Sequence, residues 1–294
     1  MNTTSPHFHL EHNVSLADYV SWKTSGSAKQ LFQPSSLENL QAFLKTLAND
    51  EPLLWIGLGS NLLIRDGGFN GTVIFTQKHL RHIELKNTTT IYAECGVACP
   101  SLARFAAKHH LSDAEFFAGI PGTIGGALAM NAGAFGGETW EKVLRVECID
   151  RQGIIHQRSA TEFAISYRTV ETSREEWFVG ASFEFASGDK TNALEKIKHL
   201  LDKRAATQPT GVPTCGSVFR NPPGDYAARL IEACGLKGHQ IGGAVVSEKH
   251  ANFIVNTGTA TASDIEQLVD YVAATVLEQQ GVQLHREVKV MGER

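Results

Sequence analysis

Residues 118–136 read AGIPGTIGGALAMNAGAFG. Glycines, one proline and small side chains fill most of these positions. A backbone without Cβ atoms can approach a large flat ligand along its length, which ordinary helix or strand packing rarely requires. We therefore predict that this segment binds an extended ligand that carries phosphates. A packing interface of small residues is the alternative interpretation.

A second glycine-rich segment, GLGSNLL at 57–63, follows a predicted strand at 53–56. Backbone amides in such a loop can converge on a phosphate. The segment differs from the dinucleotide-binding fingerprint, because Leu62 stands where a third glycine belongs and no helix is predicted over 64–71. A Rossmann fold is therefore disfavoured, and an ordinary strand-to-turn junction stays open as the alternative.

The composition limits the class of protein. The chain has 294 residues, of which 42% are hydrophobic and 20% charged, as in soluble folded proteins. Its 27 basic and 31 acidic residues give a net charge of −4, so no global positive field attracts nucleic acid or an anionic membrane. No apolar run reaches the roughly 18 residues of a membrane-spanning helix. The first 22 residues lack the pattern of a signal peptide.

Cysteine usage points to a reducing compartment. The five cysteines show neither paired metal-binding spacing nor the density of a disulfide scaffold. We predict a cytoplasmic protein without a metal site. The cysteines are Cys95, Cys99, Cys148, Cys215 and Cys234.

Apolar periodicity predicts an α+β chain. Ser263 and Glu266 have the spacing of a capping box at the start of the last helix, and Gly281 is expected to end that helix. Residues 208–216 hold two prolines and two glycines and are predicted to form a loop. Helices are predicted over 37–47, 100–110, 191–206, 227–234 and 263–280, and strands over 53–56, 72–76, 90–94, 143–149, 153–158, 177–185 and 283–291.

The glycine-rich segments resemble the two FAD-binding loops of the UDP-N-acetylenolpyruvoylglucosamine reductase family. Further motifs follow in the family's order, and the resemblance extends from about residue 25 to the end of the chain. It implies an FAD-binding fold of the vanillyl-alcohol-oxidase (PCMH) type, with two flavin-binding domains and a third α+β domain that binds substrate. The further motifs are ISYR at 165–168, CGSVFRNP at 215–222, LIE at 230–232, GLKG at 235–238, SEKHANF at 247–253 and Glu287-Val288.

The resemblance also implies a reaction and its cofactors. It implies NADPH-dependent reduction of UDP-N-acetylglucosamine enolpyruvate to UDP-N-acetylmuramate in peptidoglycan precursor synthesis. Non-covalent FAD would take a hydride from NADPH and pass it from N5 to C3 of the enolpyruvyl group. The residues implied to bind FAD are Gly57, Leu58, Gly59, Ser60, Asn61, Leu62, Gly119, Ile120, Pro121, Gly122, Thr123, Gly125, Gly126, Asn131, Gly133 and Ala134.

Three residues match the family's catalytic positions. Arg168 matches the catalytic arginine, whose guanidinium fork suits a carboxylate and would stabilise an enolate. Ser217 matches the serine that delivers a proton to C2, and Glu287 matches the acid that polarises the enolpyruvyl group together with Arg168. Taken alone, these residues are interpreted as an ion-pairing arginine, a turn serine and an exposed acid. Cys215 is interpreted as a packing residue of its loop.

Substrate contacts are implied at six positions, including one of the catalytic residues. The 247–252 string and Lys237 would help to grip the nucleotide diphosphate. For His250 and Asn252, a structural role and a substrate contact both stay open. The implied positions are Tyr167, Arg168, Asn221, Lys237, His250 and Asn252.

The expected domain division follows the family. Residues 1–77 with 284–294 would form the first flavin-binding domain, 78–188 the second, and 189–283 the substrate-binding domain. Only 49 positions separate Arg168 from Ser217. That interval leaves no room for the tyrosine-bearing lid loop of the longer branch of the family. The chain resembles the shorter branch.

Two other functions stay open at this stage. One is a flavin oxidase of the same fold that acts on an alcohol or sugar with oxygen, which reduction by NADPH would distinguish. The other is a non-catalytic nucleotide-binding or interaction protein, for which the Arg, Ser and Glu positions would be coincidental. For the reductase we expect a small-molecule substrate, UDP-N-acetylglucosamine enolpyruvate, and no nucleic-acid or membrane partner, and a monomer is favoured.

Overall fold

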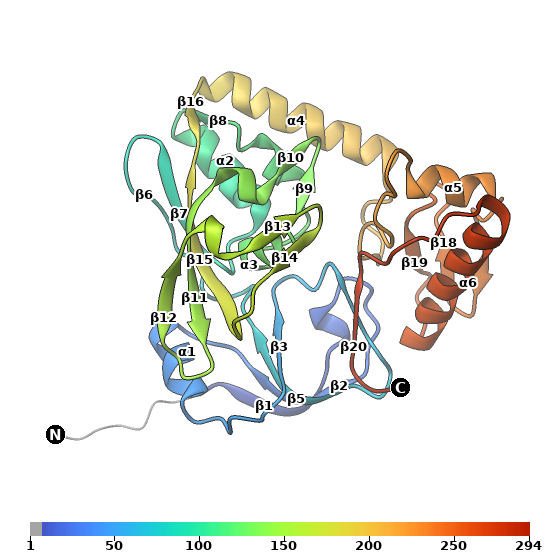
Figure 1. The fold of residues 1–294 in the computed structure, drawn as a ribbon, viewed down its shortest axis with the longest axis horizontal. Coiled ribbons are helices and arrows are strands. Elements are labelled where there is room, and N and C mark those ends of the chain that lie inside the picture. Colours follow the sequence, from blue (N-terminus) through green and yellow to red (C-terminus); the bar gives the residue numbers. More distant parts are fainter. Residues whose placement is uncertain (1–7) are drawn as a thin grey trace. The chain divides into compact units, whose positions relative to one another are not determined.

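The computed structural model describes residues 8–294 (Figure 1). The contacts divide the chain into two compact units, each of which is described by itself. Unit 1 comprises 8–11, Gln30–Leu58 and Gly71–Lys203, and unit 2 comprises His12–Lys29, Gly59–Asn70 and Arg204–Arg294. The prediction that residues 1–22 are not a signal peptide falls in part on residues 1–7, which lie outside the described residues. Over the described part of the chain, no helix combines the length and hydropathy needed to cross a membrane.

An antiparallel five-stranded sheet of order β12-β11-β15-β7-β6 forms the main part of unit 1 (Figure 1). Residues alternate between its faces, since successive side chains of a strand point to opposite sides. Ala93 and Phe183 are buried in the core, whereas their neighbours Tyr92 and Ser182 are half-buried on the other face. The strands are β6 (Ile83–Leu85), β7 (Thr90–Glu94), β11 (Val143–Asp150), β12 (Ile155–Arg158) and β15 (Glu176–Glu184).

Two helices complete the core of unit 1. Helix α2 (Cys99–Lys108) contributes Leu102 and Ala106 to the buried cluster, and α3 (Ile124–Ala129) contributes Ile124 and Leu128. Helix α3 contacts β7, β14 and β15. The helix therefore fixes the position of the glycine-rich segment that precedes and begins it.

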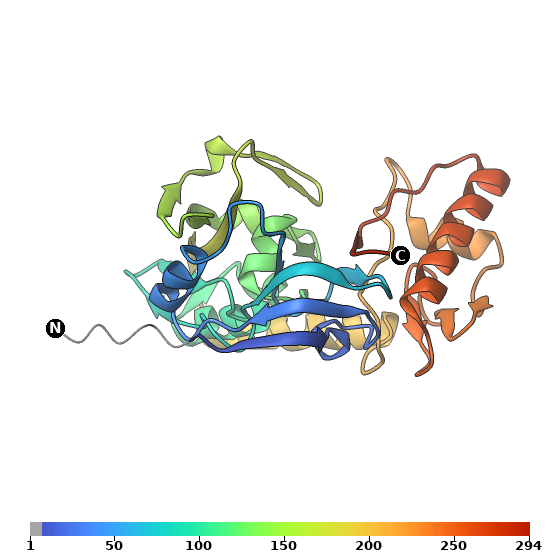
Figure 2. The same ribbon diagram turned by 90° about the horizontal axis from the view of Figure 1, so that it is seen from below.

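Short elements surround this core. Strands β13 (Ala164–Ser166) and β14 (Thr169–Glu171) form a hairpin, seen in yellow-green in Figure 2. The remaining short elements are β8 (Leu111–Ser112), η2 (Glu115–Gly119), β9 (Gly133–Ala134), β10 (Gly137–Glu138), η3 (Thr139–Lys142), η4 (Ala160–Glu162) and β16 (Ala186–Ser187).

A four-stranded sheet has the order β1-β2-β5-β3, and three of its strands have residues in both units. Strand β3 pairs in parallel with β5. Helix α1 (Leu37–Leu44) begins after Ser36, whose Oγ accepts the Asn39 amide at 3.1 Å, and Phe43 stacks on Phe32. The strands are β1 (Leu10–Ser15), β2 (Ser27–Phe32), β3 (Leu53–Ile56) and β5 (Phe69–Phe75), and η1 (Ala17–Tyr19) follows β1.

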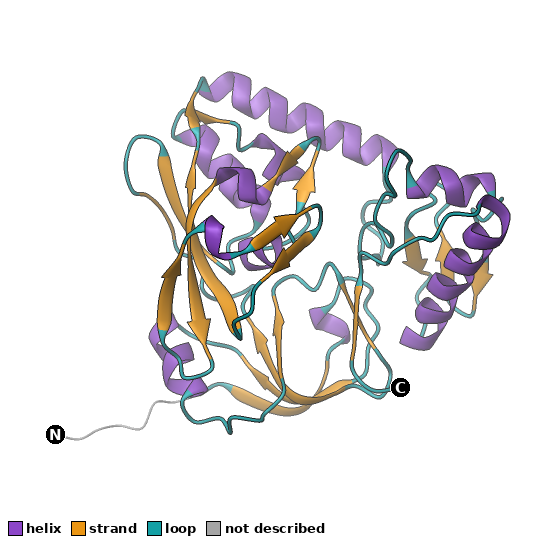
Figure 3. Ribbon diagram, in the orientation of Figure 1, coloured by secondary structure: helices purple, strands orange, loops and turns teal. Residues whose placement is uncertain are grey.

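In unit 2, helices α5 (Ala227–Ala233) and α6 (Ala262–Gln280) pack with a three-stranded sheet of order β17-β18-β19 (Figure 3). Buried side chains from α6, including Leu268 and Val272, join Leu230 and Ile231 of α5 in one core. The long helix α4 (Lys190–Thr207) leads into this unit. The sheet strands are β17 (Gln240–Ile241), β18 (Ala244–Val246) and β19 (Ile254–Asn256), and β4 (Leu62–Ile64) pairs in parallel with β20 (Lys289–Met291).

Three predictions of local structure were wrong. The capping box of α6 is made by Thr261 and Asp264, since the helix starts at Ala262 and Glu266 instead pairs with Arg65. The strand predicted over 283–291 is formed only at Lys289–Met291. Residues 125 and 126 belong to the first turn of α3 and not to an extended loop. In each case a tertiary contact or helix packing outweighed the local pattern.

Candidate active site

Arg168 lies in the two-residue turn between β13 and β14. Its φ of 55° places this non-glycine residue in the left-handed region. Such a conformation costs about 1–3 kcal/mol and persists only when surrounding contacts hold it. The position of the Arg168 side chain in this turn is therefore reached at a cost in backbone energy, which the contacts around the residue must offset.

The guanidinium of Arg168 is held by the end of the second glycine-rich segment. Its Nη2 donates to the carbonyl oxygen of Gly133 at 2.9 Å, and Nη1 donates to that of Asn131 at 3.3 Å. A Cβ at position 133 would lie 3.1 Å from Nη1 and 2.4 Å from the carbonyl oxygen of Gly137. Glycine at 133 thus permits the close approach of the arginine.

Asn131 connects several parts of this region. The side chain is 2% exposed, and its Nδ2 donates to Glu138 Oε2 at 2.8 Å and to the Ser166 carbonyl oxygen at 3.2 Å. Its Oδ1 accepts the Trp140 amide at 3.1 Å. Asn131, which was predicted to bind flavin, is thus held by hydrogen bonds to the hairpin that carries Arg168.

Glu138 was not predicted from the sequence. Besides its bond to Asn131, its Oε1 lies 4.0 Å from Nη1 of Arg168. The carboxylate therefore places a compensating negative charge beside the guanidinium. The sequence around Glu138, a glutamate that follows two glycines, contains no pattern that predicts its position beside Arg168.

Within unit 1, the two glycine-rich segments meet at Gly57 and Thr123. A Cβ on Gly57 would lie 2.2 Å from Thr123 Oγ1. That hydroxyl is buried and has no hydrogen-bond partner within the described residues. The space beside Gly126 is open, since only Thr123 Oγ1 lies within 4 Å of a Cβ built there, at 3.9 Å.

These features fit the binding of FAD. A buried hydroxyl without a partner can donate to a polar atom of a ligand. The open space beside Gly126 leaves room for a large flat group to approach the backbone. Thr123 and Gly126 are thus the predicted flavin-binding positions for which the structure supplies a direct physical reason, while Gly57 makes room for the Thr123 side chain.

The remainder of the first segment belongs to unit 2. Gly59 has a φ of 66°, and a Cβ there would lie 2.1 Å from the carbonyl oxygen of Tyr19. Glycine is therefore required at this turn. The segment then enters β4, which confirms that no helix follows it.

Ser217 and Glu287 lie on two segments of unit 2 that run antiparallel. The Glu287 amide donates to the Val218 carbonyl oxygen at 2.8 Å, and the Arg220 amide donates to that of His285 at 2.9 Å. Both Ser217 and Glu287 are half-buried. The structure therefore brings these two predicted catalytic residues to one short ribbon, although 70 positions separate them.

Asn252 supports the same ribbon. Its Oδ1 accepts the Phe219 amide at 3.0 Å and its Nδ2 donates to the Phe219 carbonyl oxygen at 2.8 Å. The Asn252 carbonyl oxygen accepts the Val218 amide at 2.9 Å. Because Asn252 is 3% exposed, its side chain is engaged within the chain and not directed to solvent.

His250 lies beside Asn252. Its Nδ1 is 3.3 Å from the Asn252 amide and accepts that hydrogen bond when the ring is neutral. Burial lowers the pKa of His250, which favours the neutral ring. His250 therefore has a structural contact of its own in this region.

The other predicted substrate contacts are also engaged. Asn221 Oδ1 accepts the Ala227 amide at 3.1 Å, at the start of α5. Lys237 Nζ donates to Glu232 Oε1 at 2.7 Å. Tyr167 is exposed, and the Arg168 guanidinium lies 4.9 Å from the centre of its ring. Of the six predicted substrate contacts, Tyr167 and Arg168 belong to unit 1 and the other four to unit 2.

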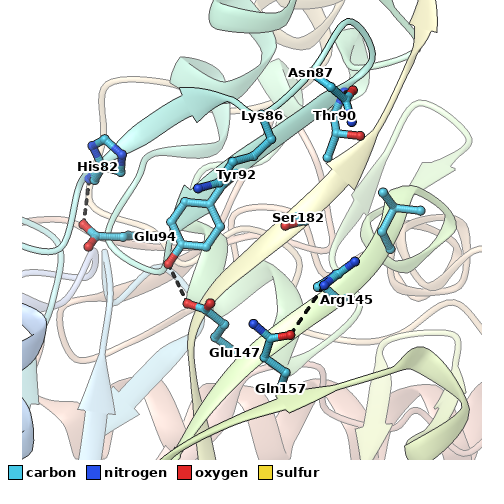
Figure 4. Close-up of a pocket in the computed structure, with 11 residues that line it drawn as sticks. His82, Lys86, Asn87, Thr90, Tyr92, Glu94, Arg145, Glu147, Gln157 and Ser182 are labelled. Atoms are coloured by element: carbon cyan, nitrogen blue, oxygen red, sulfur yellow. Dashed lines mark hydrogen bonds between the residues drawn. The ribbon is translucent and has the colours of Figure 1, made fainter.

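A pocket of about 620 Å³ lies on the polar face of the five-stranded sheet (Figure 4). The Tyr92 hydroxyl donates to Glu147 Oε2 at 2.7 Å, and burial is the main factor that raises the pKa of Tyr92. The Lys86 ammonium lies 5.1 Å from the ring centre of Tyr92. None of the residues predicted to bind FAD or substrate lines this pocket.

Two family models match the chain. The FAD binding domain model matches residues 28–159, and the C-terminal domain model of UDP-N-acetylenolpyruvoylglucosamine reductase matches 208–291. The reductase of Legionella pneumophila (strain Paris) is 55% identical over 282 residues, which cover 96% of this chain and 93% of the relative. The reductase of Methylococcus capsulatus is 55% identical, with 97% and 93% covered.

The chain belongs to the UDP-N-acetylenolpyruvoylglucosamine reductase family. The crystal structure of the reductase from Thermus caldophilus has a TM-score of 0.83 at 32% identity, and the alignment covers 97% of this chain and 99% of that one. The predicted fold class is therefore confirmed, as is the prediction of an FAD-dependent oxidoreductase.

The match to the FAD binding domain model also confirms the prediction of FAD as a cofactor. A non-catalytic binding protein and an oxidase are both disfavoured, since the relatives are reductases over nearly the whole chain. The individual site residues and the domain boundaries at 77, 188 and 283 stay predictions.

Proposed function

We propose that the chain catalyses the NADPH-dependent reduction of UDP-N-acetylglucosamine enolpyruvate to UDP-N-acetylmuramate in peptidoglycan precursor synthesis. The observation that carries this proposal is 55% identity to curated reductases over 96% of the chain. FAD, when bound, supplies hydride transfer from NADPH to C3 of the enolpyruvyl group. The protein must then hold the substrate carboxylate, manage the charge that develops and protonate C2.

Arg168 is proposed to hold the substrate carboxylate. A guanidinium can donate two parallel hydrogen bonds to a carboxylate and stabilise the negative charge that grows there as the hydride arrives. The carbonyl oxygens of Asn131 and Gly133 support this role, because they fix the orientation of the guanidinium. Tyr167 is proposed to contact the substrate beside it.

Ser217 is proposed to deliver the proton to C2, and Glu287 to polarise the enolpyruvyl group. A serine hydroxyl is a weak acid, so its action as a proton donor needs neighbouring groups that stabilise the alkoxide. The hydrogen bond from the Glu287 amide to Val218 supports a joint role, since it ties together the two segments that carry these residues.

Other features of the proposal rest on the resemblance. Residues of the two glycine-rich segments are proposed to bind FAD, and Asn221 and Lys237 the substrate. For His250 and Asn252, the hydrogen bonds around Phe219 and the Asn252 amide support a structural role. The division into flavin-binding domains at 1–77 with 284–294 and at 78–188, and a substrate domain at 189–283, belongs to the same proposal. We further propose a cytoplasmic, monomeric enzyme of the shorter branch of the family.

The test separates the two half-reactions in a Ser217→Ala variant. Reduction of the bound flavin by NADPH is expected to be unchanged, whereas oxidation of the reduced flavin by the enolpyruvate is expected to slow by about 10²–10⁴-fold, the usual contribution of a proton donor. Ser182→Ala, on the polar face of the sheet, is the matched control and should leave both rates unchanged. Normal turnover of Ser217→Ala would contradict the proposal.

A further inference from the structure

Asn61 of the first glycine-rich segment holds the backbone of Glu287 within unit 2. Its Nδ2 donates to the Glu287 carbonyl oxygen at 3.1 Å. The Lys289 amide in turn donates to the Asn61 carbonyl oxygen at 3.0 Å. Two hydrogen bonds thus join residue 61 to a segment 226 positions away in the sequence.

These bonds lie at the start of a parallel strand pair. Strand β20 pairs with β4 from Lys289 opposite Leu62 onward. The Asn61 side chain extends this pairing to Glu287, which precedes β20. On its other side, the Glu287 amide is held by Val218 at 2.8 Å. Both polar groups of the Glu287 backbone are therefore bonded, which fixes the point from which its carboxylate projects.

The same loop also anchors the segment that carries Ser217. Cys215 is buried, and its Sγ lies 3.6 Å from the Gly59 carbonyl oxygen and 3.4 Å from that of Leu62. Burial raises the pKa of the Cys215 thiol to about 12, so the group is a neutral donor. The loop 59–62 therefore contacts both chain segments that bear the proposed proton-handling residues.

We propose that Asn61 is a positioning residue, which sets the place of the Glu287 carboxylate by holding the Glu287 backbone to the flavin-binding loop. The inference rests on the proposed function, in which Glu287 polarises the enolpyruvyl group. It assigns the Asn61 side chain a role in the second half-reaction, while the backbone of the loop remains available to bind FAD.

The test is made on the FAD-loaded protein with Asn61→Ala and with Asn61→Asp, which keeps the size of the side chain but lacks the donor. Each variant should be reduced by NADPH at the wild-type rate. Oxidation of the reduced flavin by the enolpyruvate should slow about five- to tenfold, as expected when one supporting hydrogen bond is lost. Gln240→Ala, which removes an amide-to-carbonyl bond to Gly242 in the same unit, is the matched control.

A double-mutant cycle with Glu287→Gln identifies the route of the effect. If Asn61 acts through the Glu287 carboxylate, adding Asn61→Ala to Glu287→Gln should slow the second half-reaction by less than about twofold. Fully multiplicative effects, an unchanged second half-reaction or slower reduction by NADPH would each overturn the inference. Failure of the wild-type reduced flavin to react with the enolpyruvate would instead overturn the proposed function itself.

Discussion

Replacing Asn252 by alanine should destabilise the fold more than it weakens substrate binding. The side chain is 3% exposed and makes two hydrogen bonds with the backbone of Phe219, at 3.0 and 2.8 Å. Its loss leaves one buried amide and one buried carbonyl without these partners. At about 1–3 kcal/mol for each of the two groups, the free energy of unfolding should fall by about 2–6 kcal/mol.

The assay is urea-induced unfolding of the FAD-loaded protein, combined with the KM for the enolpyruvate. Asn252→Asp should also be destabilised, because its carboxylate cannot donate to the Phe219 carbonyl oxygen. For the unfolding measurement, Asn221→Ala is the matched control, since it loses one bond to the Ala227 amide and should cost only about 1 kcal/mol. An Asn252→Ala protein of unchanged stability with a raised KM would refute this reasoning and identify Asn252 as a substrate contact.

Three further predictions follow from the geometry. Gly57→Ala should weaken FAD binding about tenfold in a fluorescence titration, because the added Cβ would overlap Thr123 Oγ1. Adding Thr123→Ala should restore part of the affinity, and an unchanged affinity of Gly57→Ala would contradict this prediction. Glu266→Gln should lower stability at pH 7 by about 1–3 kcal/mol, since it disrupts the 2.8 Å pair with Arg65. Because Arg65 lowers the pKa of Glu266, this difference should vanish as the pH falls well below 4.5, and a constant difference would refute the pairing. Burial lowers the pKa of His250 below 6.5, so on acidification the unfolded chain binds a proton before the folded protein does. The folded protein should therefore lose stability as the pH falls below 6.5. Melting curves of His250→Gln should show a smaller loss of stability over this range, and an equal loss would exclude His250 as the cause.

The sequence predicted the regular elements of the fold well where local patterns are strong. Strands at 53–56 and 90–94 are confirmed with the predicted bounds, as is the end of the last helix at Gly281, whose φ is 67°. These elements are short alternating or strongly periodic segments with clear boundaries. The segment 283–288 was misassigned, because its pairing with residues 218–220 is an isolated bridge between Phe219 and Arg286 and not a continuous ladder. Whether a partner strand continues such a pairing depends on the fold and leaves no local pattern.

The site was predictable to the extent that its residues carry distinctive motifs. The glycine-rich segments were found because glycine is needed where backbones approach closely, as at Gly133 beside Arg168. Glu138 and the side-chain role of Asn61 were not predicted, since each depends on a partner brought near by folding. Asn252 shows the converse, because a motif residue implied to bind substrate is buried and bonded to Phe219.

Anaerobic visible absorption of the FAD-loaded protein tests the central claim most directly. NADPH should bleach the flavin absorbance, and UDP-N-acetylglucosamine enolpyruvate added afterwards should restore the oxidised spectrum without oxygen, one equivalent for each flavin. A flavin that NADPH bleaches, but that only oxygen restores, would contradict the proposed substrate. A protein that binds no FAD would contradict the assignment of both glycine-rich segments.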